Sequence, residues 1–243
     1  CSYFSATMAI YLLSTIVAYS RCRKTAEAAV EAQCAVIGNV GFLGIPMLAL
    51  LMGEAAIGPV ILVLAVDLIV FGSLIVILIT GSRDGRMSLG IFRTVGLGLI
   101  KNPMLVSIAC GLTWSALELP IPAPVDEFLT ILGAAATPGA LFAIGASLAT
   151  KAAVRMVDAA WISFGKLILH PAAVAVSALV IFPVEPFAAG VMIAAAALPV
   201  AGNVFILAEH YGVAAARVSA SILVSTAVSI LTVSISIAWL ATL

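Results

Sequence analysis

Three ionisable side chains lie inside long apolar stretches of this sequence, where a charge is costly: Asp67, Lys166 and His170. Charged or titratable residues in such stretches usually serve ion pathways, proton relays or charged ligands. Lys166 and His170 are four residues apart and therefore share one helix face, and an imidazole titrates close to neutral pH. The three residues predict a site for a coupling ion, either a proton or sodium.

Each of these residues also has a purely structural interpretation. Asp67 could be a hydrogen-bonding partner for a neighbouring helix. Lys166 lies only about 10 Å from the nearer end of its apolar stretch, so its ammonium could snorkel to the cytoplasmic interface. His170 precedes Pro171 and could be an ordinary hydrogen-bonded core residue. The sequence leaves these alternatives open.

Two apolar stretches are interrupted near their middle by glycine, asparagine and proline. The first interruption is Gly38–Pro46 (GNVGFLGIP) and the second is Pro199–Asn203 (PVAGN). Proline lacks the N–H group that continues a helix, and glycine weakens a helix. An asparagine in hydrocarbon is costly unless its amide is hydrogen-bonded. The pattern favours a pair of broken helices, although each break alone could be a kink whose asparagine joins two helices.

A broken helix offers free N–H groups where one half begins and free carbonyl groups where the other half ends. The N–H groups attract carboxylates, and the carbonyl groups attract cations or hydrogen-bond donors. Asn39 and Asn203 add amides that both donate and accept, and Gly41 lies in the first break. We predict a binding site for a small organic anion here, without a catalytic group.

The composition limits the class of protein. Apolar residues make up 64% of the 243 residues and charged residues only 9%, divided into 11 basic and 11 acidic. A soluble domain carries roughly 25% charged residues, so a soluble enzyme, a nucleic-acid binder and a disordered chain are poor candidates. The four cysteines show no metal or disulfide spacing, and no catalytic or nucleotide-binding motif occurs. The remaining class is an all-α polytopic membrane protein.

Continuous apolar runs of about twenty residues predict transmembrane helices. We expect eight spans with these bounds: Tyr3–Ser20, Ala32–Met52, Ala55–Thr80, Leu105–Leu119, Phe128–Thr150, Ala159–Phe182, Phe187–Ala208 and Val213–Leu243. The two interruptions fall in the second and the seventh span.

The segments that join these spans alternate in charge. Ten of the eleven basic residues lie on one side: Arg21, Arg23, Lys24, Arg83, Arg86, Arg93, Lys101, Lys151, Arg155 and Arg217. The other side carries acidic residues and no basic ones: Glu54, Glu118, Asp126, Glu127 and Glu185. The basic side is cytoplasmic by the positive-inside rule. Both termini are then non-cytoplasmic.

The second and seventh spans are five spans apart, so they cross the membrane in opposite directions. Broken helices of opposite direction are typical of inverted repeats with a binding site at the bilayer midplane. If each repeat contains five spans, the first three spans correspond to the last three. The fourth and fifth spans then have no counterparts in the chain. We therefore expect a ten-span protein with two spans before Tyr3 and a groove beside the first span. The expected division is 1–80 for the end of the first repeat, 81–101 for a cytoplasmic loop and 102–243 for the second repeat.

Four stretches resemble the auxin efflux carrier family, which includes plant PIN-type carriers and bacterial malonate-transporter-like proteins. They are Gly38–Pro46 (GNVGFLGIP), Lys101–Pro103 (KNP) with Gly111–Trp114 (GLTW), Pro138–Leu148 (PGALFAIGASL), and Leu198–Pro199 with Ala208–Gly212 (AEHYG). The resemblance covers nearly the whole chain. It implies ten spans in two inverted five-span repeats, broken helices that cross, and both termini outside the cytoplasm.

The resemblance also implies that a substrate binds beside this crossover. Asn39 and Pro46 match the first broken helix, and Pro199 and Val200 match the second. Gly38 stands where plant members carry a proline before this asparagine, so auxin is not the expected substrate. Bacterial members commonly carry small organic acids.

The expected function is secondary transport of a small organic anion, a mono- or dicarboxylate, by alternating access across a bacterial inner membrane. A non-transporting membrane sensor and a channel with the same fold are the alternatives. No enzymatic activity, cofactor, metal or nucleic-acid partner is expected. Coupling to protons or sodium and assembly into a homodimer stay open.

Cys22 tests the predicted orientation because Arg21, Arg23 and Lys24 flank it. In a variant that keeps Cys22 as its only cysteine, an impermeant thiol reagent should label the protein from the cytoplasmic face alone. Labelling is compared in intact cells and in inverted membrane vesicles. Modification of Cys22 in intact cells would overturn the orientation.

Overall fold

The computed structural model describes residues 1–84, 93, 96–97, 100, 103–149 and 156–240. This part of the chain is helical, and its only β-type pairing is an isolated bridge. The elements are α1 (Ser2–Ser20), α2 (Thr25–Val36), η1 (Val40–Gly44), α3 (Ile45–Met52), η2 (Glu54–Ala56), α4 (Ile57–Ala65), η3 (Val66–Phe71), α5 (Gly72–Asp84), α7 (Pro103–Ala116), α8 (Ala123–Ala149), α9 (Met156–Phe164), η4 (Gly165–Leu169), α10 (His170–Val176), η5 (Ser177–Ile181), α11 (Pro186–Ala196), α12 (Gly202–His210) and α13 (Ala215–Leu240). The short elements η1, η3, η4 and η5 are π-helical turns, and η2 is a 3₁₀ turn.

Among the residues that the structure describes, four continuous helices are long and apolar enough to cross a membrane, judged by length and composition. They are Ser2–Ser20, Glu54–Ser82, Met156–Ile181 and Ala215–Leu240. Two further segments are interrupted: α2 continues through η1 into α3, and α11 is separated from α12 by a non-helical stretch. These helices occupy predicted spans in chain order, and the total of eight spans stays a prediction.

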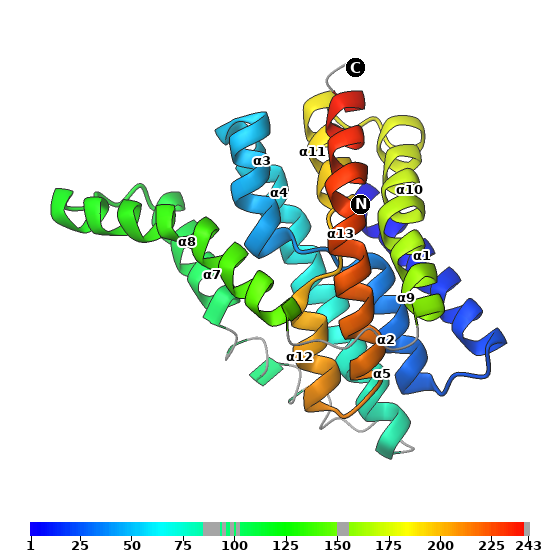
Figure 1. The fold of residues 1–243 in the computed structure, drawn as a ribbon. Helices are drawn as coiled ribbons and strands as arrows, with labels where there is room; N and C mark the ends of the chain where they lie inside the picture. The colour runs from blue at the N-terminus through cyan, green and yellow to red at the C-terminus, as the bar shows by residue number, and fades with distance from the viewer. Residues whose placement is uncertain (85–92, 94–95, 98–99, 101–102, 150–155, 241–243) are drawn as a thin grey trace.

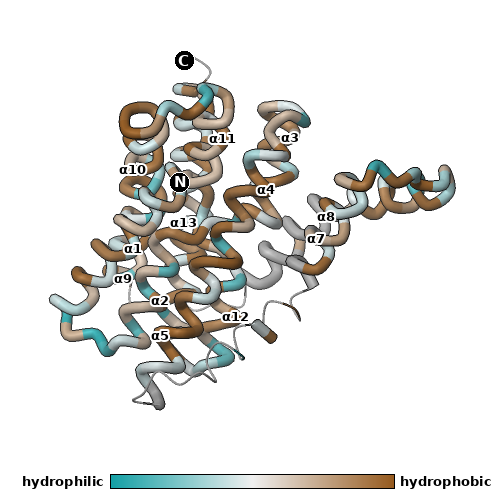
Figure 2. The backbone as a smooth tube through the Cα atoms, turned by 180° about the vertical axis from the view of Figure 1, so that it is seen from behind, coloured by the Kyte–Doolittle hydropathy of each residue, from teal (hydrophilic) through white to brown (hydrophobic). Residues whose placement is uncertain are grey.

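The outer face of the bundle is apolar. Leu50 is 84% exposed, Leu62 is 70% exposed and Ile230 is 71% exposed. Figure 2 shows strongly hydrophobic stretches along α4 and α5. Large exposed apolar areas are unfavourable in water but match the hydrocarbon of a bilayer. The surface therefore supports a multi-pass membrane protein.

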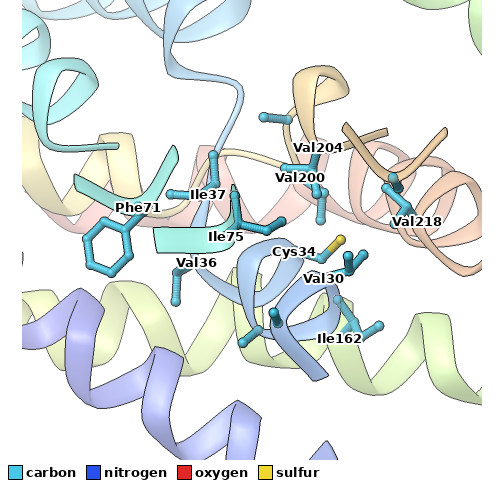
Figure 3. Close-up of a cluster of buried hydrophobic side chains, with 14 of the residues drawn as sticks. Val30, Cys34, Val36, Ile37, Phe71, Ile75, Ile162, Val200, Val204 and Val218 are labelled. Atoms are coloured by element: carbon cyan, nitrogen blue, oxygen red, sulfur yellow. The ribbon is translucent and has the colours of Figure 1, made fainter. Parts of the chain in front are cut away.

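Two clusters of buried apolar side chains fill the interior. One gathers residues of α2, α5, α9 and α13 around the second broken helix, among them Val30, Ile75, Ile162, Val200 and Val218 (Figure 3). The other joins α3, α4 and α11, with Leu48, Val60, Val191 and Leu198 among its members. The two interrupted helices contribute to both clusters, so apolar packing encloses the place where they meet.

The helices α7 and α8 lie apart from this bundle. Figure 1 shows both extending to one side of it, and side chains such as Trp114 (46%) and Phe128 (62%) are exposed. α8 reaches back to contact η1 and α13. The bundle that holds the interrupted helices consists of α1–α5 and α9–α13.

An apolar groove of about 610 Å³ lies beside α1. Its walls come from α1, α4, η3 and α11 and include Phe4, Leu62, Val66, Ile69 and Met192. A groove beside the first helix is the feature that the five-span period predicts. The five-span repeat itself stays a prediction.

The half-helix α11 begins with a well-formed N-cap. The Glu185 carboxylate accepts hydrogen bonds from Phe187 N at 3.0 Å and Ala188 N at 2.8 Å, and Pro186 occupies the first turn. These two N–H groups lower the pKa of Glu185, because they favour its charged form. The cap fixes where this half of the broken helix starts.

A network of charged side chains ties α2, α9 and α13 together at the end predicted to be cytoplasmic. Arg217 of α13 bonds Glu31 and lies 2.9 Å from Glu27 of α2. Arg23 bonds Asp158 of α9 at 2.8 Å and lies 3.2 Å from Glu31. The side chains of Arg217 and Glu31 are each only 7% exposed. A pair this buried contributes little net stability, but the loss of one partner is costly.

Removal of one partner of this pair should therefore cost more than removal of both. Arg217→Met removes one of the two arginines beside the buried Glu31 carboxylate and leaves only Arg23, at 3.2 Å, so we expect it to lose about 1–3 kcal/mol of unfolding free energy. Adding Glu31→Gln should recover much of that loss. Unfolding of the single and double variants is measured in detergent. Arg93→Met, at an exposed position, is the control, and an equal loss in the single and double variants would contradict the buried pair.

Candidate functional site

The two interrupted helices meet at their interruptions. Two backbone hydrogen bonds join them: Asn39 N donates to Pro199 O at 2.8 Å, and Ala201 N donates to Ile37 O at 3.1 Å. Between these bonds Gly38 faces Val200 in an antiparallel bridge. The two breaks therefore cross, as predicted, and neither of them is a simple kink.

Small residues permit this close approach. A Cβ atom at Gly38 would lie 3.2 Å from Lys166 Nζ and 3.3 Å from Ala195 O. A Cβ atom at Gly44 would lie 2.7 Å from Leu198 Cδ1, which is closer than two carbon atoms pack. A side chain at Gly38 would have to displace its neighbours by a few tenths of an ångström, and one at Gly44 would have to move the buried Leu198 side chain.

Three of the predicted site residues shape the backbone of the crossing. Pro46 lies in the first turn of α3, where its missing N–H group is not needed. Pro199 supplies the carbonyl that accepts from Asn39 N. Val200 N donates to Ser225 Oγ of α13 at 3.1 Å. None of these three lines the cavity at the crossing.

A small cavity of about 30 Å³ lies at the crossing. Its lining includes four predicted site residues, Asn39, Gly41, Asp67 and Asn203, together with Gly38. The volume is enough for a water molecule. The fold therefore gathers three predicted binding residues and one predicted coupling residue around one small cavity.

Asp67 is the acidic residue of this cavity. It is 2% exposed and lies in the π-turn η3. Its Oδ1 accepts a hydrogen bond from Tyr3 OH at 2.9 Å, so Asp67 does join a neighbouring helix. Its Oδ2 and Asn203 Oδ1 are both buried without a hydrogen-bond partner among the described residues. Two acceptor oxygens at the crossing are thus unused.

Lys166 lies beside the other half of the crossing. It is fully buried and donates to Ala196 O in the last turn of α11. Its Nζ is 3.2 Å from His170 Nδ1, and His170 Nε2 is 3.0 Å from Thr7 Oγ1. The snorkelling alternative is therefore wrong, because the ammonium turns inward to the carbonyl end of a broken helix. His170 is a hydrogen-bonded core residue that also contacts Lys166.

Sequence reasoning missed two polar residues of α1. Tyr3 bonds Asp67, and its ring packs edge-on against His170 with 5.7 Å between centroids. Thr7 bonds His170. Their spacing of four residues in an apolar span was the available signal. The π-turns that carry Asp67 and Lys166 were also missed, although such turns are frequent at functional sites.

The crossing has the chemistry to hold an anion. α12 begins at Gly202, which lines the cavity, and the first turn of a helix presents N–H groups and a partial positive charge. Lys166 adds a buried cation next to Gly38. The amides of Asn39 and Asn203 can donate to a ligand or accept from it.

Comparisons with known proteins point to membrane transport. The sequence profile of a family described as "Membrane transport protein" matches residues 1–237. A protein of Rhizobium meliloti (strain 1021), named "Putative malonate transporter", is 28% identical over 228 residues, which make up 91% of this chain and 70% of that protein. The similarity extends over both interrupted helices and the bundle around them.

The tight contact at Gly44 gives a test of the crossing. Gly44→Ala places a methyl group against Leu198, and we expect it to destabilise the protein by about 1–3 kcal/mol through overpacking. Gly58→Ala is the matched control, since a Cβ there meets nothing within 4 Å and alanine favours a helix. Melting temperatures in detergent are compared. Equal stability of the two variants would contradict the close crossing.

Proposed function

This chain belongs to the membrane transport protein family, and from that premise we propose that it is a secondary transporter for a small organic anion, a mono- or dicarboxylate. The proposed substrate site is the crossing of the two broken helices. Asn39, Gly41 and Asn203 would contact the substrate, while Pro46, Pro199 and Val200 would hold the backbone that surrounds it.

The cavity at the crossing is the observation that carries this proposal. Apolar clusters pack against both interrupted helices, yet Asn39, Asp67 and Asn203 all line the cavity. Irregular backbone at membrane depth is tolerated where it lines a cavity. Paired discontinuous helices are a recurrent way to build a transporter binding site.

The charges around the crossing favour an anionic substrate. The first turn of α12 supplies N–H groups, and Lys166 supplies an ammonium that is fully buried. A carboxylate matches both kinds of group. The name of the Rhizobium meliloti relative refers to malonate, a small dicarboxylate, and this supports the same class of substrate.

Asp67, Lys166 and His170 are the proposed coupling residues. Lys166 and His170 are in direct contact, and Tyr3 connects Asp67 with the same region through its hydroxyl and its ring. A proton or a sodium ion that enters with the substrate would change the net charge of the site, which contains the Asp67 carboxylate and the Lys166 ammonium. The substrate anion would then be accompanied by a compensating positive charge.

Transport would require this cavity to open to each side of the membrane in turn. At about 30 Å³ it is closed to a dicarboxylate, so substrate binding must widen it. We place the protein in a bacterial inner membrane with both termini outside the cytoplasm, since the basic residues gather on the opposite side. A channel is disfavoured because apolar clusters enclose the crossing, whereas a sensor would bind the anion without moving it.

Counterflow in proteoliposomes tests the proposal, because only a carrier exchanges labelled substrate for unlabelled substrate. Labelled malonate should accumulate in vesicles preloaded with malonate. Asn39→Ala and Asn203→Ala should each lower the rate by about 5- to 150-fold, since each removes a buried polar contact to the substrate.

Ser236→Ala is the matched control, because the Ser236 hydroxyl donates to Thr232 O of its own helix and does not line the crossing. Its counterflow rate should equal that of the wild type. Wild-type rates in both asparagine variants would place the substrate site away from the crossing. Absence of counterflow for malonate and for other mono- and dicarboxylates would refute the carrier function.

A further inference from the structure

Two buried acceptor oxygens at the crossing lack donors. They are Asp67 Oδ2, from η3, and Asn203 Oδ1, from α12, and neither has a hydrogen-bond partner in the part of the chain that the structure describes. Both side chains line the same cavity. An acceptor that is buried without a donor costs free energy, and a carboxylate oxygen costs more than an amide oxygen.

The titratable groups around Asp67 are Tyr3 on α1, Lys166 on η4 and His170 on α10, and each has a hydrogen-bond partner. Tyr3 OH donates to the other oxygen of Asp67. Lys166 Nζ donates to Ala196 O and contacts His170 Nδ1. Among the described residues no donor bonds the two free oxygens, so a molecule that enters the cavity can supply one.

The cavity has room for such a donor. Its volume of about 30 Å³ is enough for a water molecule, which can donate to two acceptors at once. A hydroxyl group of a ligand can replace this water and keep a hydrogen bond to the site. A ligand that lacks a donor would expel the water and leave both oxygens unpaired. A fully ionised second carboxylate would in addition repel Asp67.

We propose that the substrate of this carrier is an anion with a hydroxyl donor in addition to its carboxylate: a singly protonated dicarboxylic acid or a hydroxy acid. The carboxylate is bound by the N–H groups at the start of α12 and by the charge of Lys166. The hydroxyl donates to Asp67 and Asn203, which are the specificity-determining residues. This inference rests on the proposed function and narrows its substrate class.

A series of three-carbon acids isolates the donor. Propionate has none, 3-hydroxypropionate has one, malonate has one when singly protonated, and the monomethyl ester of malonate has none. Each acid is used to compete with labelled malonate for counterflow by the wild-type protein. We expect 3-hydroxypropionate and malonate to compete at concentrations at least about tenfold lower than propionate and the ester. Competition by malonate should strengthen as the pH falls and its monoanion forms, whereas 3-hydroxypropionate should show a weaker pH dependence.

Asp67→Asn tests the residue itself, because it keeps the shape of the side chain and removes its charge. The preference for 3-hydroxypropionate over propionate should fall towards one in this variant. It should stay at the wild-type value in Ser236→Ala. A variant that keeps the full preference would show that Asp67 does not bind the donor and would overturn the proposal.

The wild-type series is decisive even if Asp67→Asn does not fold. Equal competition by all four acids overturns the donor requirement and leaves the carrier function intact. Absence of malonate counterflow, with no thermal stabilisation of the protein by any of the four acids, overturns the carrier function and the donor requirement together.

Discussion

The structure depends on one constraint: a polar backbone group in the membrane interior has no water to bond and must find a partner within the protein. Each broken helix exposes such groups where its two halves separate. Asn39 N and Pro199 O satisfy one another, as do Ala201 N and Ile37 O. Neither break is stable alone, so the two must meet. Glycine at positions 38 and 44 leaves room for this close approach.

This pairing determines where charge is tolerated inside the bundle. Lys166 is fully buried, yet it is stabilised by Ala196 O at the carbonyl end of α11. Asp67 is stabilised on one oxygen by Tyr3, and the other oxygen stays free beside the cavity. The crossing is therefore the polar centre of an apolar protein. A ligand that binds at this centre can donate the hydrogen bonds that Asp67 Oδ2 and Asn203 Oδ1 lack.

The bundle around the crossing has one charged end and apolar sides. Charged side chains of α2, α9 and α13 form an interlocked network at one end of the bundle, with Arg217 bonded to Glu31 and Glu27. Apolar clusters fill the interior around the crossing, and apolar side chains also cover the outer face. The ion pairs thus gather at one end of the bundle, and the membrane-facing part relies on packing.

The sequence by itself determined the class of this protein, because 9% charged residues cannot cover a surface that faces water. It also located both breaks and the polar side chains of the cavity, Asn39, Asp67 and Asn203, since glycine, proline, asparagine and aspartate stand out in apolar stretches. Only the tertiary structure decided which groups meet. Tyr3 and Asp67 are 64 positions apart, and Thr7 and His170 are 163 positions apart. The Lys166 side chain turns inward because its ammonium bonds Ala196 O of α11. No local sequence pattern encodes the position of that helix.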